Sequence, residues 1–183
     1  MIIRLVDRRT GGRRGRPDFA LEGPWPHLGR LVEGLGVEDW HVDLVLVDDR
    51  AIAELNGDFR GKPEVTDVLS FSYLEDEGPD DPHLAAYDAG ARKNLWWADP
   101  PAVEGRPEAV GEIILAPAFV ADRCGRKGWP VEAEIPLLVV HGCLHILGWE
   151  HDEESDREAM RDVEQDLLGA AGLEHPLRRE GQG

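Results

Sequence analysis

The sequence has few cysteines, few basic residues and no long apolar run. Its 183 residues include only two cysteines, Cys124 and Cys143, which cannot form a disulfide framework and which point to a reducing compartment. No stretch approaches the length of a membrane span, and the N-terminal residues MIIRLVDRRT lack an apolar signal region. We therefore expect a cytoplasmic protein that has no membrane partner.

The shortage of positive charge restricts the possible partners. Lys and Arg together number 20 against 37 Asp and Glu, which gives a formal net charge of −17. This balance excludes a general surface for binding polyanions, so any contact with nucleic acid must be local. Several of the arginines gather with glycines in residues 8–16, which form either a solvated loop or an accessory arm that touches RNA.

Histidine is also scarce, but three of the seven histidines fall in the stretch EIPLLVVHGCLHILGWEH. On a helix, His141 and His145 lie one turn apart on the same face. If the helix continued, His151 would lie about 15 Å from His141 along the axis. Gly148 can end the helix, because glycine adopts the left-handed conformation, and the chain can then bring His151 back.

Three imidazoles with one open position are typical of a catalytic zinc site, whereas structural sites have four protein ligands. We therefore predict one Zn²⁺ per chain, bound by His141, His145 and His151. The alternative is that these are ordinary histidines near a core helix. Cys143 would point about 160° away from both His141 and His145 on a helix, so it is interpreted as core packing.

The histidine spacing also matches the metzincin protease pattern H-E-x-x-H-x-x-G-x-x-H, with one departure. Those proteases carry a glutamate, the general base, directly after the first histidine, and this chain has Gly142 there. The metal ligands are kept and the base is missing. This difference argues against peptide hydrolysis.

The hydrophobic periodicity predicts an α+β fold in one domain that covers residues 1–183. We expect a sheet of roughly four strands, about five helices, and the metal-binding helix packed centrally on the sheet. Strand patterns cover 2–7, 42–47, 68–73 and 111–116; helix patterns cover 24–35, 50–59, 117–125, a long segment from 131, and a last segment that opens with the capping-box sequence SDRE at 155–158.

Two segments fall outside this pattern. Residues 75–109 contain five prolines, many acids and no sustained period, which is typical of an insertion or a functional flap. Trp96 and Trp97 within it either anchor the loop to the body or stack on bases. The tail from about residue 174 is expected to be frayed.

Arg60 lies in a polar turn, residues 60–64, that leads into Thr66 and Asp67 at the start of a strand. Such an arginine is either simply solvated or, if it faces a metal site, a clamp for phosphate, because its planar fork pairs bidentately with phosphate oxygens. Asp67, Glu150 and Asp152 are the carboxylates available for proton transfer or for orienting a histidine.

Together, HGCLHILGWEHD, LN-x3-R, TDVLSF, GEIIL and VEAEIPLLVVHG resemble the YbeY family of bacterial endoribonucleases. The resemblance covers most of residues 42–162 apart from 75–109. It implies that His141, His145 and His151 bind zinc and that Arg60 is the family's catalytic or RNA-binding arginine.

The resemblance further implies a single-strand-specific endoribonuclease that acts in ribosomal RNA processing, at the 3′ end of small-subunit RNA, and in ribosome quality control. Single-stranded ribosomal RNA and the ribosome or ribosomal proteins are then the expected partners. The alternatives are a metal-dependent hydrolase of another substrate, including a metzincin-like protease, and a non-catalytic ribosome assembly factor. The sequence does not indicate an oligomeric state.

Overall fold

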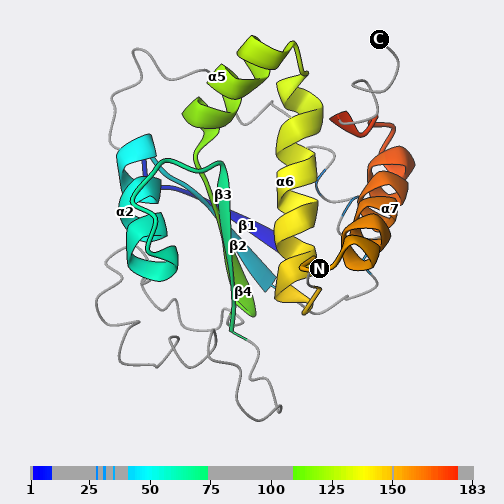
Figure 1. Ribbon diagram of the computed structural model, residues 1–183, viewed down its shortest axis with the longest axis horizontal. Helices are drawn as coiled ribbons and strands as arrows, with labels where there is room; N and C mark the ends of the chain where they lie inside the picture. The colour runs from blue at the N-terminus through cyan, green and yellow to red at the C-terminus, as the bar shows by residue number, and fades with distance from the viewer. Residues whose placement is uncertain are drawn as a thin grey trace.

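The computed structural model describes residues 2–9, 28, 31, 35, 41–73, 109–149 and 151–176, which form four strands and four helices (Figure 1). The strands are β1 (Ile2–Asp7), β2 (His41–Leu46), β3 (Val68–Ser72) and β4 (Gly111–Leu115). The helices are α2 (Asp49–Arg60), α5 (Pro117–Lys127), α6 (Val131–Ile146) and α7 (Glu154–Ala170). All four strands and these four helices lie where the sequence patterns place them, to within a few residues.

The four strands form one mixed sheet in the order β1-β2-β4-β3. β1 and β4 both pair with β2 in parallel, and β3 pairs with β4 in antiparallel. Successive residues of a strand face opposite sides of a sheet. In β2, accordingly, Leu44 and Leu46 belong to one core cluster and Val45 belongs to the other.

The helices cover both faces of the sheet. Helix α2 lies on one face, α6 lies on the other, and α7 packs on the outer side of α6 (Figure 1). The larger core cluster joins the sheet to α6 and α7, and the smaller one joins the sheet to α2. The prediction of an α+β fold with a central histidine-bearing helix is confirmed.

Helix α6 is apolar on nearly all sides, which is the pattern of a helix buried within a core. It packs tightly against the sheet at Gly142. A Cβ atom added there would lie 2.9 Å from Cγ1 of Ile113 in β4, closer than side-chain carbons normally pack. A glutamate at this position, as in the metzincins, has no room between helix and sheet.

The predicted capping box at the start of the last helix is wrong. Helix α7 begins at Glu154 with Glu153 at the N-cap, so Ser155 lies inside the first turn, and no side chain caps the helix. The Ser155 hydroxyl instead contacts the carboxylate of Asp156 at 3.4 Å. Glu154 and Asp156 still favour this end of the helix, because negative charge complements the positive end of the helix dipole.

Several predictions concern residues outside the described part of the chain. Leu28 and Leu31 are helical and buried, as the predicted helix over 24–35 requires, but most of that segment is not described. Residues 74–108, with Trp96 and Trp97, lie outside it, as do 10–27. Of the tail predicted to be frayed from about residue 174, only residues 174–176 are described, and His175 among them is buried.

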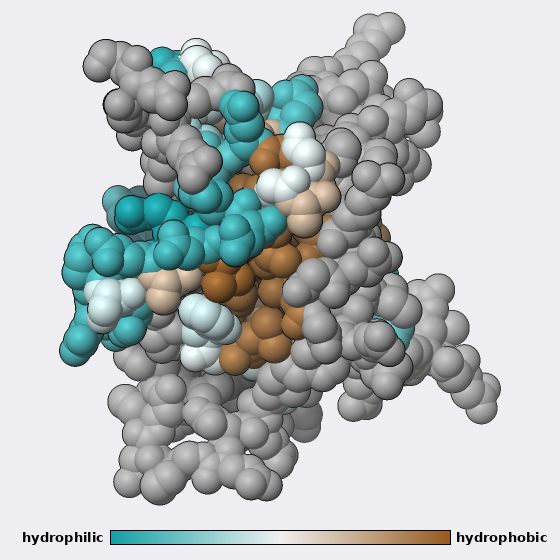
Figure 2. Space-filling model, turned by 90° about the vertical axis from the view of Figure 1, so that its right-hand side faces the viewer, coloured by the Kyte–Doolittle hydropathy of each residue, from teal (hydrophilic) through white to brown (hydrophobic). Residues whose placement is uncertain are grey.

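The surface on the side of α7 is mixed in character. Figure 2 shows hydrophilic residues in a band across this side, with hydrophobic residues gathered beside it. Among the described residues, no helix has both the length and the apolar character needed to cross a membrane.

Candidate metal centre

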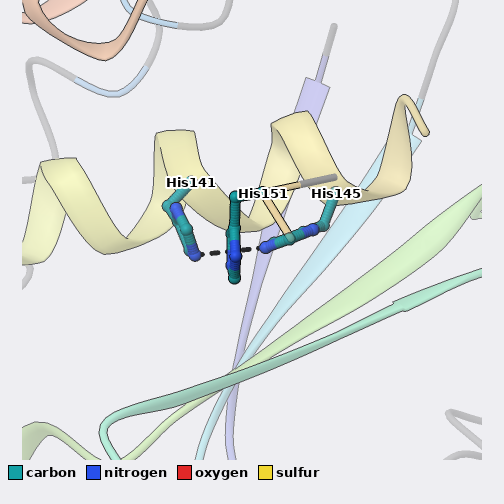
Figure 3. Close-up of side chains that lie close together, drawn as sticks. All are labelled: His141, His145 and His151. Carbon is teal, nitrogen blue, oxygen red and sulfur yellow. Dashed lines mark hydrogen bonds between the residues drawn. The ribbon is translucent and has the colours of Figure 1, made fainter. Parts of the chain in front are cut away.

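Helix α6 places two histidines on one face, one turn apart, as their spacing predicts (Figure 3). The Nε2 atoms of His141 and His145 lie 3.2 Å apart, and their ring centroids lie 4.6 Å apart with the rings nearly perpendicular. At this distance, one ring can donate an N–H to the other while the site holds no metal ion. The arrangement is that of two ligands directed at a shared point.

Gly148 ends the helix as the sequence predicts, with a left-handed φ of 85°. Its N–H donates to the carbonyl of His145 and the N–H of Trp149 donates to the carbonyl of Leu144, both at 3.0 Å. This pair of bonds is a Schellman motif, which reverses the chain at a helix end. For any residue with a Cβ atom, this left-handed conformation is less favourable than a right-handed one by roughly 1–2 kcal/mol.

The reversal brings His151 back to the other two histidines. Its ring centroid lies 5.5 Å from that of His141 and 4.9 Å from that of His145. Arg157 of α7 fixes this loop, because its Nη1 donates to the carbonyls of His151 at 3.1 Å and Asp152 at 3.2 Å. The third histidine is therefore positioned by a helix end on one side and by an arginine on the other.

The three imidazoles fit a tetrahedral metal ion. Their candidate ligand atoms all lie within 4.8 Å of one another. Zn–N bonds of about 2.0–2.1 Å at a tetrahedral angle separate two ligand nitrogens by about 3.3 Å, close to the 3.2 Å between His141 and His145. Within the part of the chain that the structure describes, this cluster contains no carboxylate or cysteine, which leaves a fourth position open.

Cys143 is excluded from the site by its environment. It is fully buried in the larger core cluster, and burial raises the pKa of its thiol to about 12. A metal ligand would have to be the thiolate, which this environment disfavours. The prediction that Cys143 packs in the core is confirmed.

The pKa of His145 is lowered to about 4. Burial is the largest cause, followed by the neighbouring His141 and His151 and by the positive charge of Arg60, while a hydrogen bond with the backbone of Trp149 acts in the opposite direction. His145 is therefore a neutral imidazole at neutral pH. Neutral imidazole is the form that binds a metal ion.

Glu164 of α7 is a member of the site that the sequence reading missed. Its Oε1 lies 2.8 Å from Nδ1 of His141, and its Oε2 lies 3.4 Å from Nε2 of His175. Burial alone would raise the pKa of Glu164, but the hydrogen bonds with the two histidines outweigh it and lower the pKa. The sequence feature that could have identified Glu164 is its place on the apolar stripe of α7, four residues after Met160 and four before Leu168, where a charged residue is unusual.

Arg60 is the last residue of α2 and is not part of the turn that the sequence predicts; the turn begins one residue later, at Gly61 with a φ of 67°. Its side chain is exposed, and its charge is felt by His145, as the lowered pKa of that histidine records. Arg60 is therefore an exposed cation whose charge makes the smallest of the contributions to the pKa of His145.

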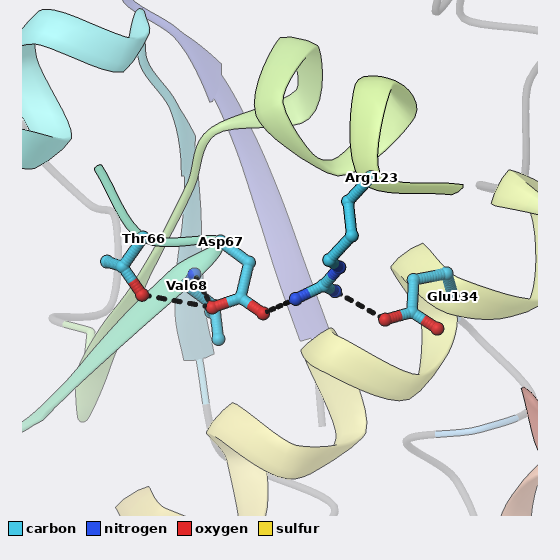
Figure 4. Close-up of polar contacts among 5 residues, drawn as sticks. All are labelled: Thr66, Asp67, Val68, Arg123 and Glu134. Atoms are coloured by element: carbon cyan, nitrogen blue, oxygen red, sulfur yellow. Dashed lines mark hydrogen bonds and ion pairs between the residues drawn. The ribbon is translucent and has the colours of Figure 1, made fainter. Parts of the chain in front are cut away.

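Asp67 is engaged elsewhere (Figure 4). One carboxylate oxygen accepts hydrogen bonds from the Thr66 hydroxyl at 3.1 Å and the Val68 N–H at 2.9 Å, and the other forms an ion pair with Arg123 of α5. Arg123 also pairs with Glu134 of α6. Burial alone would raise the pKa of Asp67, but Arg123 and the hydrogen bonds outweigh it and hold the pKa below its usual range. Asp67 therefore joins β3 to α5 and α6 and is not free to transfer protons.

The other two candidate carboxylates are less informative. Glu150 lies outside the described residues. Asp152 is exposed, and its backbone carbonyl accepts from Arg157. The described carboxylate that contacts a candidate ligand is Glu164.

Comparisons with known proteins agree with this geometry. The family model described as Endoribonuclease YbeY matches residues 30–172. Proteins named Endoribonuclease YbeY are 39% identical in Moorella thermoacetica (72% of this chain, 73% of the relative) and 36% identical in Desulfitobacterium hafniense (74% of each). A third, from Anaeromyxobacter dehalogenans, is 30% identical and spans 100% of this chain and 78% of its own length.

A solution structure from Thermotoga maritima aligns over 92% of this chain and 90% of its own, with 22% identity and a TM-score of 0.47. The family match covers every described strand and helix from β2 to α7, including the whole histidine stretch. On the strength of the family model and of these relatives, the chain belongs to the endoribonuclease YbeY family.

Proposed function

We propose that this chain is a zinc-dependent endoribonuclease that cleaves single-stranded RNA in ribosomal RNA processing, at the 3′ end of small-subunit RNA, and in ribosome quality control. The observation that carries the proposal is the convergence of His141, His145 and His151 around one point with a position left open. This arrangement occurs in a member of an endoribonuclease family. The ribosome and its proteins are the proposed partners, and the cytoplasm is the proposed location.

Zinc is proposed as the ion because three neutral imidazoles at tetrahedral spacing form one of its usual catalytic donor sets. When bound at such a site, zinc polarises phosphoryl oxygens and lowers the pKa of water at the open position to about 7. The protein's contribution is to hold the three rings in place. The Schellman turn at Gly148 and the Arg157 contacts to the loop serve this purpose.

We assign Arg60 the role of binding the scissile phosphate and offsetting charge that develops in the transition state. It is an exposed arginine whose charge reaches His145. A guanidinium presents two parallel N–H donors to phosphate oxygens, and such donors commonly contribute 10²-fold or more to rate, on the order of 2.7–4 kcal/mol.

RNA chemistry also accounts for the missing base at position 142. RNA carries its own nucleophile, the 2′-hydroxyl, so a glutamate beside the metal is less necessary than in a peptidase. The tight packing of Gly142 on Ile113 leaves no space for one. This packing favours phosphodiester cleavage over peptide hydrolysis.

The test is a cleavage assay on single-stranded RNA that carries a precursor ribosomal RNA 3′ end, run beside casein. We expect RNA cleavage by the metal-loaded protein, loss of cleavage with chelator, recovery on adding Zn²⁺, and intact casein. Intact RNA with digested casein would assign the chain to peptide hydrolysis. Intact RNA and intact casein, with metal bound, would favour a ribosome assembly factor that does not cleave.

A further inference from the structure

Glu164 is a charged side chain in an apolar environment. Only 7% of the residue is exposed, and it lies on the face of α7 that packs against α6, together with Met160, Leu167 and Leu168. A buried carboxylate is costly unless hydrogen bonds compensate for the lost water. The partners of Glu164 therefore explain its presence in the core.

Both of those partners are histidines. Oε1 lies 2.8 Å from Nδ1 of His141, and Oε2 lies 3.4 Å from Nε2 of His175. A carboxylate offers only acceptors, so each ring must donate an N–H to it. His141 then carries its proton on Nδ1 and presents the lone pair of Nε2, the atom that lies 3.2 Å from Nε2 of His145.

We propose that Glu164 is a positioning residue for the metal, which fixes the tautomer and the ring orientation of His141. Carboxylates that accept from a ligating imidazole hold the ring in place and increase its basicity, and their loss typically weakens metal binding 10–100-fold. The inference rests on the metal-binding part of the proposed function and is independent of whether RNA is the substrate.

His175 contacts the carboxylate oxygen of Glu164 that does not face His141. It is 3% exposed and follows the turn that ends α7, where Gly172 has a φ of 77° and the Leu173 N–H donates to the carbonyl of Leu168 at 2.9 Å. Its 3.4 Å contact with Glu164 is longer than the 2.8 Å contact to His141, so we assign it the smaller share. The end of α7 is in this way connected to the metal ligands.

The experiment measures Zn²⁺ affinity by competition with a chromophoric chelator, without RNA. We expect Glu164→Ala to weaken binding on the order of 10–100-fold. Glu164→Gln should weaken it less, because the amide oxygen can still accept but carries no charge, and His175→Ala should have the smallest effect. Glu158→Gln, an exposed change on the same helix, is the matched control and should bind as the wild type does.

A second measurement separates positioning from a merely structural role. Two-dimensional ¹⁵N NMR of the metal-free, folded proteins reports the tautomer of each histidine. In the wild type, His141 should carry its proton on Nδ1, and in Glu164→Ala this preference should be lost. Near-ultraviolet circular dichroism verifies folding, and the near-isosteric Glu164→Gln serves if the alanine variant does not fold.

Two results would overturn the proposal: wild-type Zn²⁺ affinity in a folded Glu164→Ala variant, or in Glu164→Gln if the alanine variant does not fold, and an unchanged His141 tautomer in folded Glu164→Ala. If the wild type fails to cleave RNA, the affinity series still decides the role of Glu164.

Discussion

Helix α6 carries two polar clusters, one at each end, and they differ in how their members are satisfied. Near its N-terminus, Glu134 pairs with Arg123, which also pairs with Asp67 (Figure 4). Near its C-terminus, His141 and His145 converge with His151 on a common point (Figure 3). In the first cluster, two carboxylates share one guanidinium, whereas in the second, three imidazoles converge on a point that a metal ion would fit.

The comparison shows that burial alone does not identify a functional group. Asp67 and Glu164 are both carboxylates with restricted exposure, and both hydrogen-bond to side chains of other elements. Asp67 forms an ion pair with Arg123 and so links β3 to α5, whereas Glu164 hydrogen-bonds to His141, a candidate metal ligand. What a buried carboxylate contacts distinguishes a structural ion pair from part of a reactive site.

The largest expected effect is at the convergent cluster. His145→Ala should remove most of the bound zinc and reduce RNA cleavage to background, because two imidazoles cannot maintain the site. Metal content by mass spectrometry and cleavage of the precursor RNA measure both effects. Retention of one zinc per chain by this variant would refute the ligand assignment.

Arg60→Ala should lower RNA cleavage by about 10²-fold or more while zinc content and folding are unchanged, since it removes a transition-state donor and no ligand. Arg60→Lys should recover little activity, because a point charge does not reproduce the bidentate fork. Single-turnover cleavage rates provide the measurement. A lysine variant as fast as the wild type would contradict bidentate phosphate binding.

A substitution in the cluster formed by Asp67, Arg123 and Glu134 should lower the stability of the fold and leave metal binding unchanged. Arg123→Ala leaves Glu134 buried without its cation, which costs on the order of 3 kcal/mol when one partner of a buried pair is lost. Urea unfolding of the metal-free protein measures this loss. Zn²⁺ affinity of the folded variant should match the wild type, and a large loss of affinity would show that the two ends of α6 are coupled.

A smaller effect is expected on the pH dependence of folding stability, because the pKa of His145 is lowered in the folded protein. As pH falls, an unfolded histidine takes up its proton near 6.5, whereas folded His145 does so only near 4. The unfolded chain therefore binds more protons between these values, and this group makes the metal-free protein less stable as pH falls from about 6.5 to about 4. An NMR titration of the His145 ring should give a midpoint near pH 4, and a midpoint above 6 would refute the burial assigned to it.

The smallest expected effect is that of Cys143→Ser. The thiol lies in the core and its pKa is raised to about 12, so the variant should keep one zinc per chain and its RNA cleavage. A modest loss of stability is expected from placing a hydroxyl in an apolar site. Loss of zinc from a folded Cys143→Ser protein would reverse the interpretation of this residue.

The parts of the site that could be predicted from sequence are those determined by local chain geometry. The four-residue spacing of His141 and His145 and the left-handed glycine at 148 fix where the imidazoles point. Short runs rich in Val, Ile and Leu likewise indicated the strands.

Contacts between separate elements could not be predicted in this way. Glu164 lies 23 positions from His141, and Arg123 lies 56 positions from Asp67, so only the packed fold brings them together. The exact residue at which a helix begins is also hard to predict, because neighbouring residues can each fit the sequence pattern of an N-cap. Ser155 has the spacing of a cap, yet α7 begins one residue before it.

X-ray absorption spectroscopy of the zinc-loaded protein tests the central claim most directly, because it reports the atoms bound to the metal. The three histidines predict a shell of nitrogen and oxygen at about 2.0–2.1 Å, with the multiple-scattering features of three imidazoles and no sulfur. A sulfur shell at about 2.3 Å, or fewer than two imidazoles, would contradict the assignment of His141, His145 and His151 as the metal ligands.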